Sequence, residues 1–199
     1  MVLAGGAGLR VGGRDKGLLP LCGQPMVERV LDRLRRQCSR LVIIANRNPE
    51  GYACHAPVVR DDGDGHAGPL AGLVAAFGFV GANSHALPRW LLSVPVDCPD
   101  PPDDLAACLR AALDGPAQAE CAYARSSDKA QPLFALYRIG NVREWRASAQ
   151  AALEVHGSAK RWHAEIGARA VDFDTDPAAF HNLNTPEDFE EYERTHART

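Results

Sequence analysis

Residues 3–16 of the chain read L-A-G-G-A-G-L-R-V-G-G-R-D-K. Five of the nine residues at positions 5–13 are glycine, and the segment directly follows an apolar start that ends at Leu3. Glycine lets the backbone approach a ligand closely and turn its N–H groups toward oxyanions. Arg10 and Lys16 add cationic donors where phosphate charge would lie. We therefore interpret the segment as a phosphate cradle rather than as a surface loop without a ligand.

Two familiar phosphate motifs do not fit this segment. A Walker A loop needs G-x-x-x-x-G-K-[ST], but the residues after Gly13 are Arg14 and Asp15. A dinucleotide fingerprint needs G-x-G-x-x-G, but the pattern that starts at Gly6 ends on Val11. The cradle is thus of another kind.

Along the rest of the chain, apolar runs of strand length alternate with stretches of helical period. The expected strands cover residues 41–45, 58–59, 90–96, 120–124, 133–137 and 171–173, and the expected helices cover 27–34, 68–77, 102–113, 141–155 and the residues from 186 onward. The run at 41–45 has no polar alternation, which is typical of a strand covered on both faces. The alternation predicts a three-layer α/β fold in one domain, with a mostly parallel sheet and a partly antiparallel second half.

Composition and charge exclude several classes of protein. Hydrophobic residues make up 46% of the 199 residues and charged residues 24%, and 22 Lys+Arg against 25 Asp+Glu give a net charge of −3. These values exclude disordered, collagen and coiled-coil chains, and the mild acidity argues against a nucleic-acid-binding surface. The longest apolar run, 70–82, is too short for a membrane span, and no signal peptide is recognisable. The six cysteines form no C-x-x-C pair, so we expect buried or half-buried free thiols in a cytoplasmic protein, without a zinc site.

Polar residues follow several of the expected strands. Asp97 ends the strand at 90–96 and is a plausible Mg²⁺ ligand, although it could equally cap the turn into the next helix. Asp61 offers the same two interpretations. Asn182 and Asn184 point the same way in an extended segment, where they could bind a ligand or simply form the turn before a helix. Histidine, serine and cysteine residues show no arrangement for covalent catalysis.

The glycine-rich stretch, continued as G-L-L-P-L-C-G-Q-P, resembles the signature of the MobA-type molybdenum cofactor guanylyltransferases. Three further matches occur in the family's order: G-P-L-A-G at 68–72, V-P-V-D-C-P at 94–99 and N-L-N-T-P-E-D at 182–188. The resemblance implies a Rossmann-like nucleotidyltransferase fold. It also implies transfer of GMP from GTP to the phosphate of molybdenum-molybdopterin, with pyrophosphate released and Mg²⁺ as cofactor.

Site residues follow from the resemblance, motif by motif. Residues 1–100 would form the nucleotide-binding half and 101–199 the molybdopterin-side half. The implied catalytic residues are Lys16, Arg10 and Asp97, with Asp97 as the metal ligand; the implied nucleotide-binding residues are Leu3, Ala4, Gly5, Gly6, Lys16, Asp61 and Asp97; and Asn182 and Asn184 would face the pterin. Molybdoenzyme apo-proteins or other proteins of cofactor biosynthesis are the implied protein partners, and we expect a monomer.

Three departures from the family pattern are visible. Only three residues precede Ala4, so either the true start lies upstream or the central strand is short. Val11 replaces the usual methionine of R-M-G. Ile44 stands where relatives have the first asparagine of N-A-N-R, while Asn46 is retained.

Other functions stay open on sequence alone. The alternatives are a cytidylyltransferase of the molybdenum cofactor, a sugar-phosphate guanylyltransferase and a non-catalytic cofactor-delivery protein. The pair Gly5-Gly6 favours guanine, since pyrimidine-specific relatives more often have L-A-A-G, and Asp97 with Lys16 favours an enzyme over a carrier.

Overall fold

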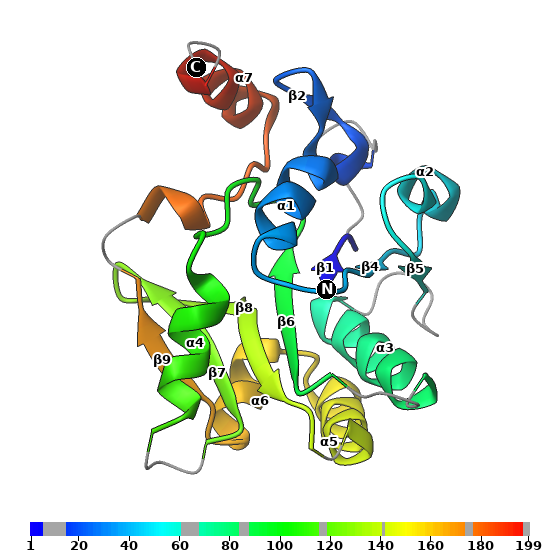
Figure 1. Cartoon of the computed structure of the whole chain (residues 1–199), viewed down its shortest axis with the longest axis vertical. Helices are drawn as coiled ribbons and strands as arrows, with labels where there is room; N and C mark the ends of the chain where they lie inside the picture. The colour runs from blue at the N-terminus through cyan, green and yellow to red at the C-terminus, as the bar shows by residue number, and fades with distance from the viewer. Residues whose placement is uncertain are drawn as a thin grey trace.

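A seven-stranded sheet runs through the molecule (Figure 1) in the order β5-β4-β1-β6-β8-β7-β9. The computed structural model describes residues 1–5, 15–60, 68–83, 88–115, 119–140, 142–173 and 177–196. The strands are β1 (Val2–Leu3), β4 (Ile43–Ile44), β5 (Val58–Val59), β6 (Trp90–Pro95), β7 (Cys121–Ser126), β8 (Lys129–Arg138) and β9 (Arg169–Asp172). β5, β4, β1 and β6 are parallel, β8 is antiparallel to both β6 and β7, and β9 is parallel to β7. This confirms a mostly parallel sheet with a mixed second half.

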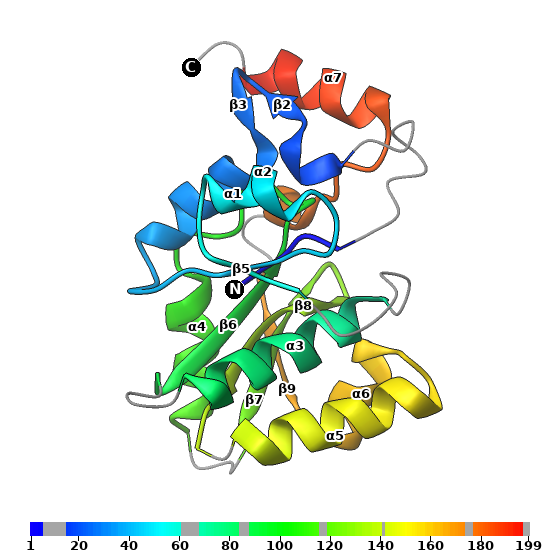
Figure 2. The same cartoon turned by 90° about the vertical axis from the view of Figure 1, so that its right-hand side faces the viewer.

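Helices cover both faces of the sheet, as Figure 2 shows. One face carries α1 (Met26–Arg35) and α4 (Leu105–Leu113), and the other carries α3 (Gly68–Ala82), α5 (Val142–Val155) and α6 (Ala159–Glu165). Successive strand residues alternate between the two cores: Val2 belongs to the α1 and α4 side, and Leu3 to the α3 and α5 side. Because helices cover both faces of the sheet, these strands do not alternate between apolar and polar residues. The predicted three-layer α/β fold is confirmed.

The central strand β1 is short but fully integrated into the sheet. The Ala4 amide donates to the Ile44 carbonyl at 2.8 Å, and the Val96 amide donates to the Leu3 carbonyl at 3.0 Å. A Cβ on Gly72 of α3 would lie 3.1 Å from Leu3 Cδ2, which is tighter than an ordinary contact. Glycine at this position of the G-P-L-A-G motif therefore lets α3 pack closely against β1.

A smaller group of elements lies beyond the carboxyl ends of the parallel strands. It contains the turn η2 (Lys16–Leu18), the hairpin β2 (Pro20–Leu21) and β3 (Gln24–Pro25), α2 (Pro49–Ala53), η4 (Pro177–Phe180) and α7 (Pro186–His196). Figure 1 shows β2 and α7 beyond the end of β6. The hairpin and α7 share a small buried cluster made of Leu21, Met26, Leu183 and Tyr192, so the C-terminal helix is fastened close to the N-terminal segment.

Several local expectations need correction. The strand expected at 41–45 is only two residues long, and the helix expected from 102 begins at Leu105, after a turn at Asp103 and Asp104. α2 and α6 were not expected, since five and seven residues are too few for a periodic pattern. All six cysteines are free, and Cys54 is exposed rather than buried. Among the described residues, every helix is too short or too polar to span a membrane.

Candidate active site

The candidate site lies at the carboxyl edge of β1 and β6. Asp97 lies two residues after the end of β6, and Gly5 lies two residues after the end of β1 and is exposed. The carboxylate of Asp97 is 25% exposed, so it stays accessible to a ligand. In parallel α/β sheets this edge is where ligands bind, because strand ends and helix starts meet there.

Lys16 contacts two of the other predicted residues, Asp97 and Asn184. Its ammonium nitrogen donates to Asn184 Oδ1 at 2.8 Å and lies 3.5 Å from Asp97 Oδ2. The side chain of Lys16 is only 19% exposed. Two oxygen ligands thus fix one cationic head at the edge of the sheet. Residues from the two ends of the chain share this site, since Lys16 and Asn184 are 168 positions apart.

The segment of Asn182 and Asn184 is held in place by the residue between them. Leu183 is 2% exposed in the cluster under α7, and its amide donates to the Asp97 carbonyl at 2.9 Å. Asn182 and Asn184 flank this buried anchor, as the extended spacing predicts. Asn182 Oδ1 accepts from the Cys98 thiol, and burial together with the charge of Asp97 raises the pKa of that thiol well above its usual range. The thiol is therefore a neutral hydrogen-bond donor.

The start of α7 fixes the backbone of Asn184. Asp188 Oδ2 accepts from the Asn184 amide at 2.7 Å and from the Thr185 amide at 2.8 Å, while Thr185 Oγ1 accepts from the Asp188 amide at 3.3 Å. This is the reciprocal capping typical of a Thr at the N-cap with an acidic residue three positions later. A well-capped α7 thus holds Asn184 against Lys16.

The remaining predicted residues fall into two groups. In the first, the Leu3 carbonyl and Ala4 amide already bond within the sheet, which leaves the exposed Gly5 as the more accessible backbone at the end of β1. The second group, Gly6, Arg10 and Asp61, lies outside the described residues. Ile44 is 3% exposed and packs in the core.

The sequence did not indicate the residues that hold the backbone next to Lys16. Tyr52 of α2 is fully buried, and its hydroxyl donates to Asp15, directly before Lys16. Asn48 Nδ2 also donates to Asp15, at 3.1 Å. A Pro at the first position of a helix, here Pro49, was the available signal for α2. For Cys98, which contacts Asn182, the sequence predicts only a buried or half-buried thiol.

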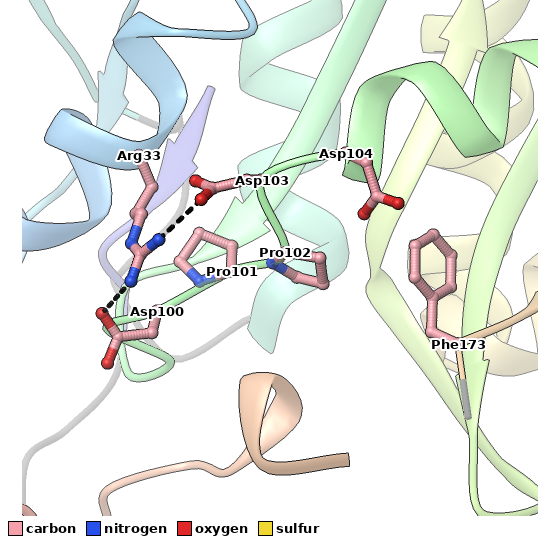
Figure 3. A pocket seen from close by; sticks show the side chains of 7 residues that line it. All are labelled: Arg33, Asp100, Pro101, Pro102, Asp103, Asp104 and Phe173. Atoms are coloured by element: carbon pink, nitrogen blue, oxygen red, sulfur yellow. Dashed lines mark hydrogen bonds and ion pairs between the residues drawn. The ribbon is translucent and has the colours of Figure 1, made fainter. Parts of the chain in front are cut away.

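A separate hollow of about 270 Å³ lies beside the loop after β6 (Figure 3). Arg33 points into it, with its guanidinium 3.4 Å from Asp100 and 2.8 Å from Asp103. Pro101, Pro102, Asp104 and Phe173 complete its lining. Its cation already has two carboxylate partners and Asp104 adds a third carboxylate to the lining, so the hollow is unfavourable for an anion.

Comparison with known proteins places this arrangement in a family. The model of the MobA-like NTP transferase domain matches residues 1–170. The chain belongs to this family. Its sheet and its glycine-rich start are accordingly those of an NTP transferase domain.

Individual relatives agree with this family assignment. The chain is 39% identical over 190 residues to the molybdenum cofactor guanylyltransferase of Shewanella loihica, covering 94% of this chain and 91% of that protein. It is 38% identical over 197 residues to the protein of that name from Yersinia pestis, covering 98% and 94%. Among solved structures, molybdopterin-guanine dinucleotide biosynthesis protein A from Archaeoglobus fulgidus superposes with a TM-score of 0.72 at 21% identity, over 100% of this chain and 98% of that one. At that identity the likeness concerns the fold alone.

Proposed function

We propose that this member of the MobA-like family is a molybdenum cofactor guanylyltransferase. It would transfer GMP from GTP to the phosphate of molybdenum-molybdopterin, giving molybdopterin guanine dinucleotide and pyrophosphate. The names of its relatives support this activity. The observation that carries it in the structure is the meeting of Lys16, Asp97 and Asn184 at one sheet edge.

The reaction is an in-line displacement at the α-phosphorus of GTP. A molybdopterin phosphate oxygen forms the new P–O bond, and the bond between the α-phosphorus and the bridging oxygen of pyrophosphate breaks. The protein contributes mainly positioning and charge neutralisation. Lys16, held by Asn184, would stabilise the charge that moves onto pyrophosphate, and Arg10 would add a second cation. Residues Leu3 to Gly6 and Asp61 would contact the nucleotide.

The donor set at the edge fits a magnesium ion. Mg²⁺ binds proteins through one or two carboxylates, with water and substrate phosphates completing its coordination. The Asp97 carboxylate, partly exposed and next to the proposed phosphate-binding lysine, is such a ligand. No group of three or more His, Cys, Asp or Glu side chains suited to a metal occurs among the described residues. When bound, Mg²⁺ supplies positive charge to the phosphate oxygens.

The pterin side would be formed by the second half of the chain. Because Asn182 Oδ1 accepts from Cys98, its amide N–H groups remain to donate to a substrate acceptor. We also propose that the enzyme acts in the cytoplasm as a monomer and passes its product to molybdoenzyme apo-proteins or other proteins of cofactor biosynthesis.

The test is pyrophosphate release from GTP with molybdopterin, with Mg²⁺ and with the metal chelated. We expect Lys16→Ala and Asp97→Ala each to lower kcat/KM about a hundredfold, the usual loss for one preorganised charged group. The melting temperature should stay nearly unchanged. Lys160→Ala, at an exposed position of α6, removes the same charge at the opposite end of the sheet, because α6 packs through Trp162 on Tyr137, which pairs with Leu91 near the start of β6; it should leave the rate unchanged. Normal turnover in either site variant at saturating Mg²⁺ would overturn the assignment.

Nucleotide choice distinguishes this function from its alternatives. Calorimetric titration with GTP, CTP and ATP should show GTP binding most tightly. Preference for CTP would indicate a cytidylyltransferase, and GTP binding without pyrophosphate release would indicate a cofactor-delivery protein.

A further inference from the structure

The turn that carries Lys16 rests on a short helix from another part of the chain. α2 follows β4 and presents Tyr52, which is fully buried although it lies next to a surface site. The Tyr52 hydroxyl donates to Asp15, the residue before Lys16. Asn48, just before α2, donates to the other carboxylate oxygen of Asp15 at 3.1 Å. Asp15 is therefore held by two donors.

The residue after Lys16 touches the same hydroxyl. A Cβ on Gly17 would overlap the Tyr52 hydroxyl and would lie 2.9 Å from Val96 Cγ2. Glycine is thus the residue that lets the backbone pass this close to the ring. Burial and then the bond to Asp15 raise the pKa of Tyr52 above its usual range, whereas the Gly17 amide acts as a donor and lowers it. The phenol stays neutral, so it can donate to Asp15 and accept from Gly17 together.

Both neighbours of Lys16 are therefore fixed by one buried phenol. The head of Lys16 is fixed separately, by Asn184 Oδ1 at 2.8 Å. The lysine stem has to bridge these two anchors. Its direction at the sheet edge depends on the backbone between Asp15 and Gly17 as much as on Asn184.

We propose that Tyr52 is a positioning residue for Lys16, acting through contacts of its hydroxyl with Asp15 and Gly17. This inference rests on the proposed function, in which Lys16 binds the phosphates of GTP. Tyr52 itself touches no substrate. Its contribution is to hold the lysine where the triphosphate is to bind.

The experiment is a double-mutant cycle between Tyr52→Phe and Lys16→Ala. Phenylalanine keeps the buried ring and removes only the hydroxyl. We expect Tyr52→Phe to weaken GTP affinity and to lower kcat/KM for pyrophosphate release about tenfold in the wild-type background, because misplacement of a catalytic group reduces rates steeply. In the Lys16→Ala background the same change should have less than a twofold effect.

Tyr137→Phe is the matched control. Tyr137 is also fully buried, and its hydroxyl contacts His163 at 2.9 Å among aromatic residues of α5 and α6. Its loss should lower the melting temperature without changing KM or kcat by more than twofold. A purely structural role for Tyr52 would make the two variants behave alike.

Two results would overturn the proposal: unchanged GTP affinity and rate in Tyr52→Phe, or an equal loss in both lysine backgrounds. Calorimetric GTP titration keeps the proposal testable without molybdopterin. If wild-type protein binds GTP but releases no pyrophosphate, the proposed function fails, whereas the effect of Tyr52 on GTP affinity is still decided.

Discussion

Gly17→Ala should destabilise the protein by close packing alone. The added methyl group would overlap the Tyr52 hydroxyl, lie 2.9 Å from Val96 Cγ2 and lie 3.1 Å from Tyr52 Cε1. The ring of Tyr52 is fully buried and Val96 is 7% exposed, so neither neighbour has free space to move into. Such overpacking costs about 1–3 kcal/mol. For a chain of this size, 2 kcal/mol corresponds to a fall in melting temperature of about 4–8 °C.

The matched control is Gly51→Ala on the same interface. A Cβ there would lie 2.8 Å from Leu18 Cδ1, the end of a flexible side chain that can turn away. Alanine also favours the helix over glycine by about 1 kcal/mol. We therefore expect Gly51→Ala to leave the free energy of unfolding unchanged or to raise it by up to about 1 kcal/mol. Comparing the two variants thus distinguishes neighbours that cannot move, at Gly17, from a side chain that can, at Gly51.

The assay is urea unfolding of Gly17→Ala in the wild-type and Tyr52→Phe backgrounds. If the hydroxyl is the main obstacle, removing it should recover about half of the cost of Gly17→Ala, which appears as a coupling free energy of about 1 kcal/mol. The reasoning would be refuted by Gly17→Ala melting like wild type. An identical cost in both backgrounds would show that the Val96 contact, and not the hydroxyl, makes glycine necessary.

Three further predictions concern the supporting structure. Burial lowers the pKa of His163 from 6.5 to about 4. The unfolded chain therefore binds the proton more tightly, and the free energy of unfolding should fall by about 3 kcal/mol as pH drops from 7 to 4. In urea unfolding, His163→Gln should show a smaller fall over this pH range than wild type. Asp188→Ala removes the acceptor of two amides at the start of α7. It should lower the free energy of unfolding, measured by thermal denaturation, by about 1 kcal/mol and raise KM. An unchanged KM would show that the cap does not influence the candidate site. Phe77→Ala removes a ring that is 1% exposed and packs against Tyr137, Trp145 and Trp162. It should lower the free energy of unfolding by about 3–5 kcal/mol. The control Val155→Ser, at a position 76% exposed, should change it by no more than about 0.5 kcal/mol.

The fold could be predicted from the sequence because its strong elements carry strong local patterns. α1 repeats apolar residues at helical spacing, and Val27, Val30, Leu31 and Leu34 are all buried. β6 is apolar except for the buried Ser93, because both of its faces are covered. Short elements lack such a pattern. α2 and the hairpin of β2 and β3 are fixed by tertiary contacts with η2 and α7, which leave no periodic trace in the sequence.

For the candidate site, the sequence selects three side chains that the structure places in contact, but it does not predict the contacts themselves. Strand-end logic and the family resemblance select Lys16, Asp97 and Asn184, and the structure brings these three together. Which oxygen approaches which nitrogen depends on packing far away in sequence. The bond from Lys16 to Asn184 needs Leu183 in its buried cluster and the bond from the Leu183 amide to the Asp97 carbonyl.

The backbone next to Lys16 and its ammonium group are therefore held by parts of the fold that differ in stability. On one side, α2 and Asp15 are tied to the sheet through β4 and β5 and through the buried ring of Tyr52. On the other, Asn184 depends on α7, whose buried residue Tyr192 donates to Asp100 in the loop after Asp97. α7 buries little else, so local opening of this helix should require less free energy than global unfolding. Such opening would release the head of Lys16 from Asn184 while leaving its backbone and Asp97 in place. If Lys16 binds the phosphates of GTP as proposed, this opening would let it exchange the Asn184 amide for a phosphate without disturbing the sheet.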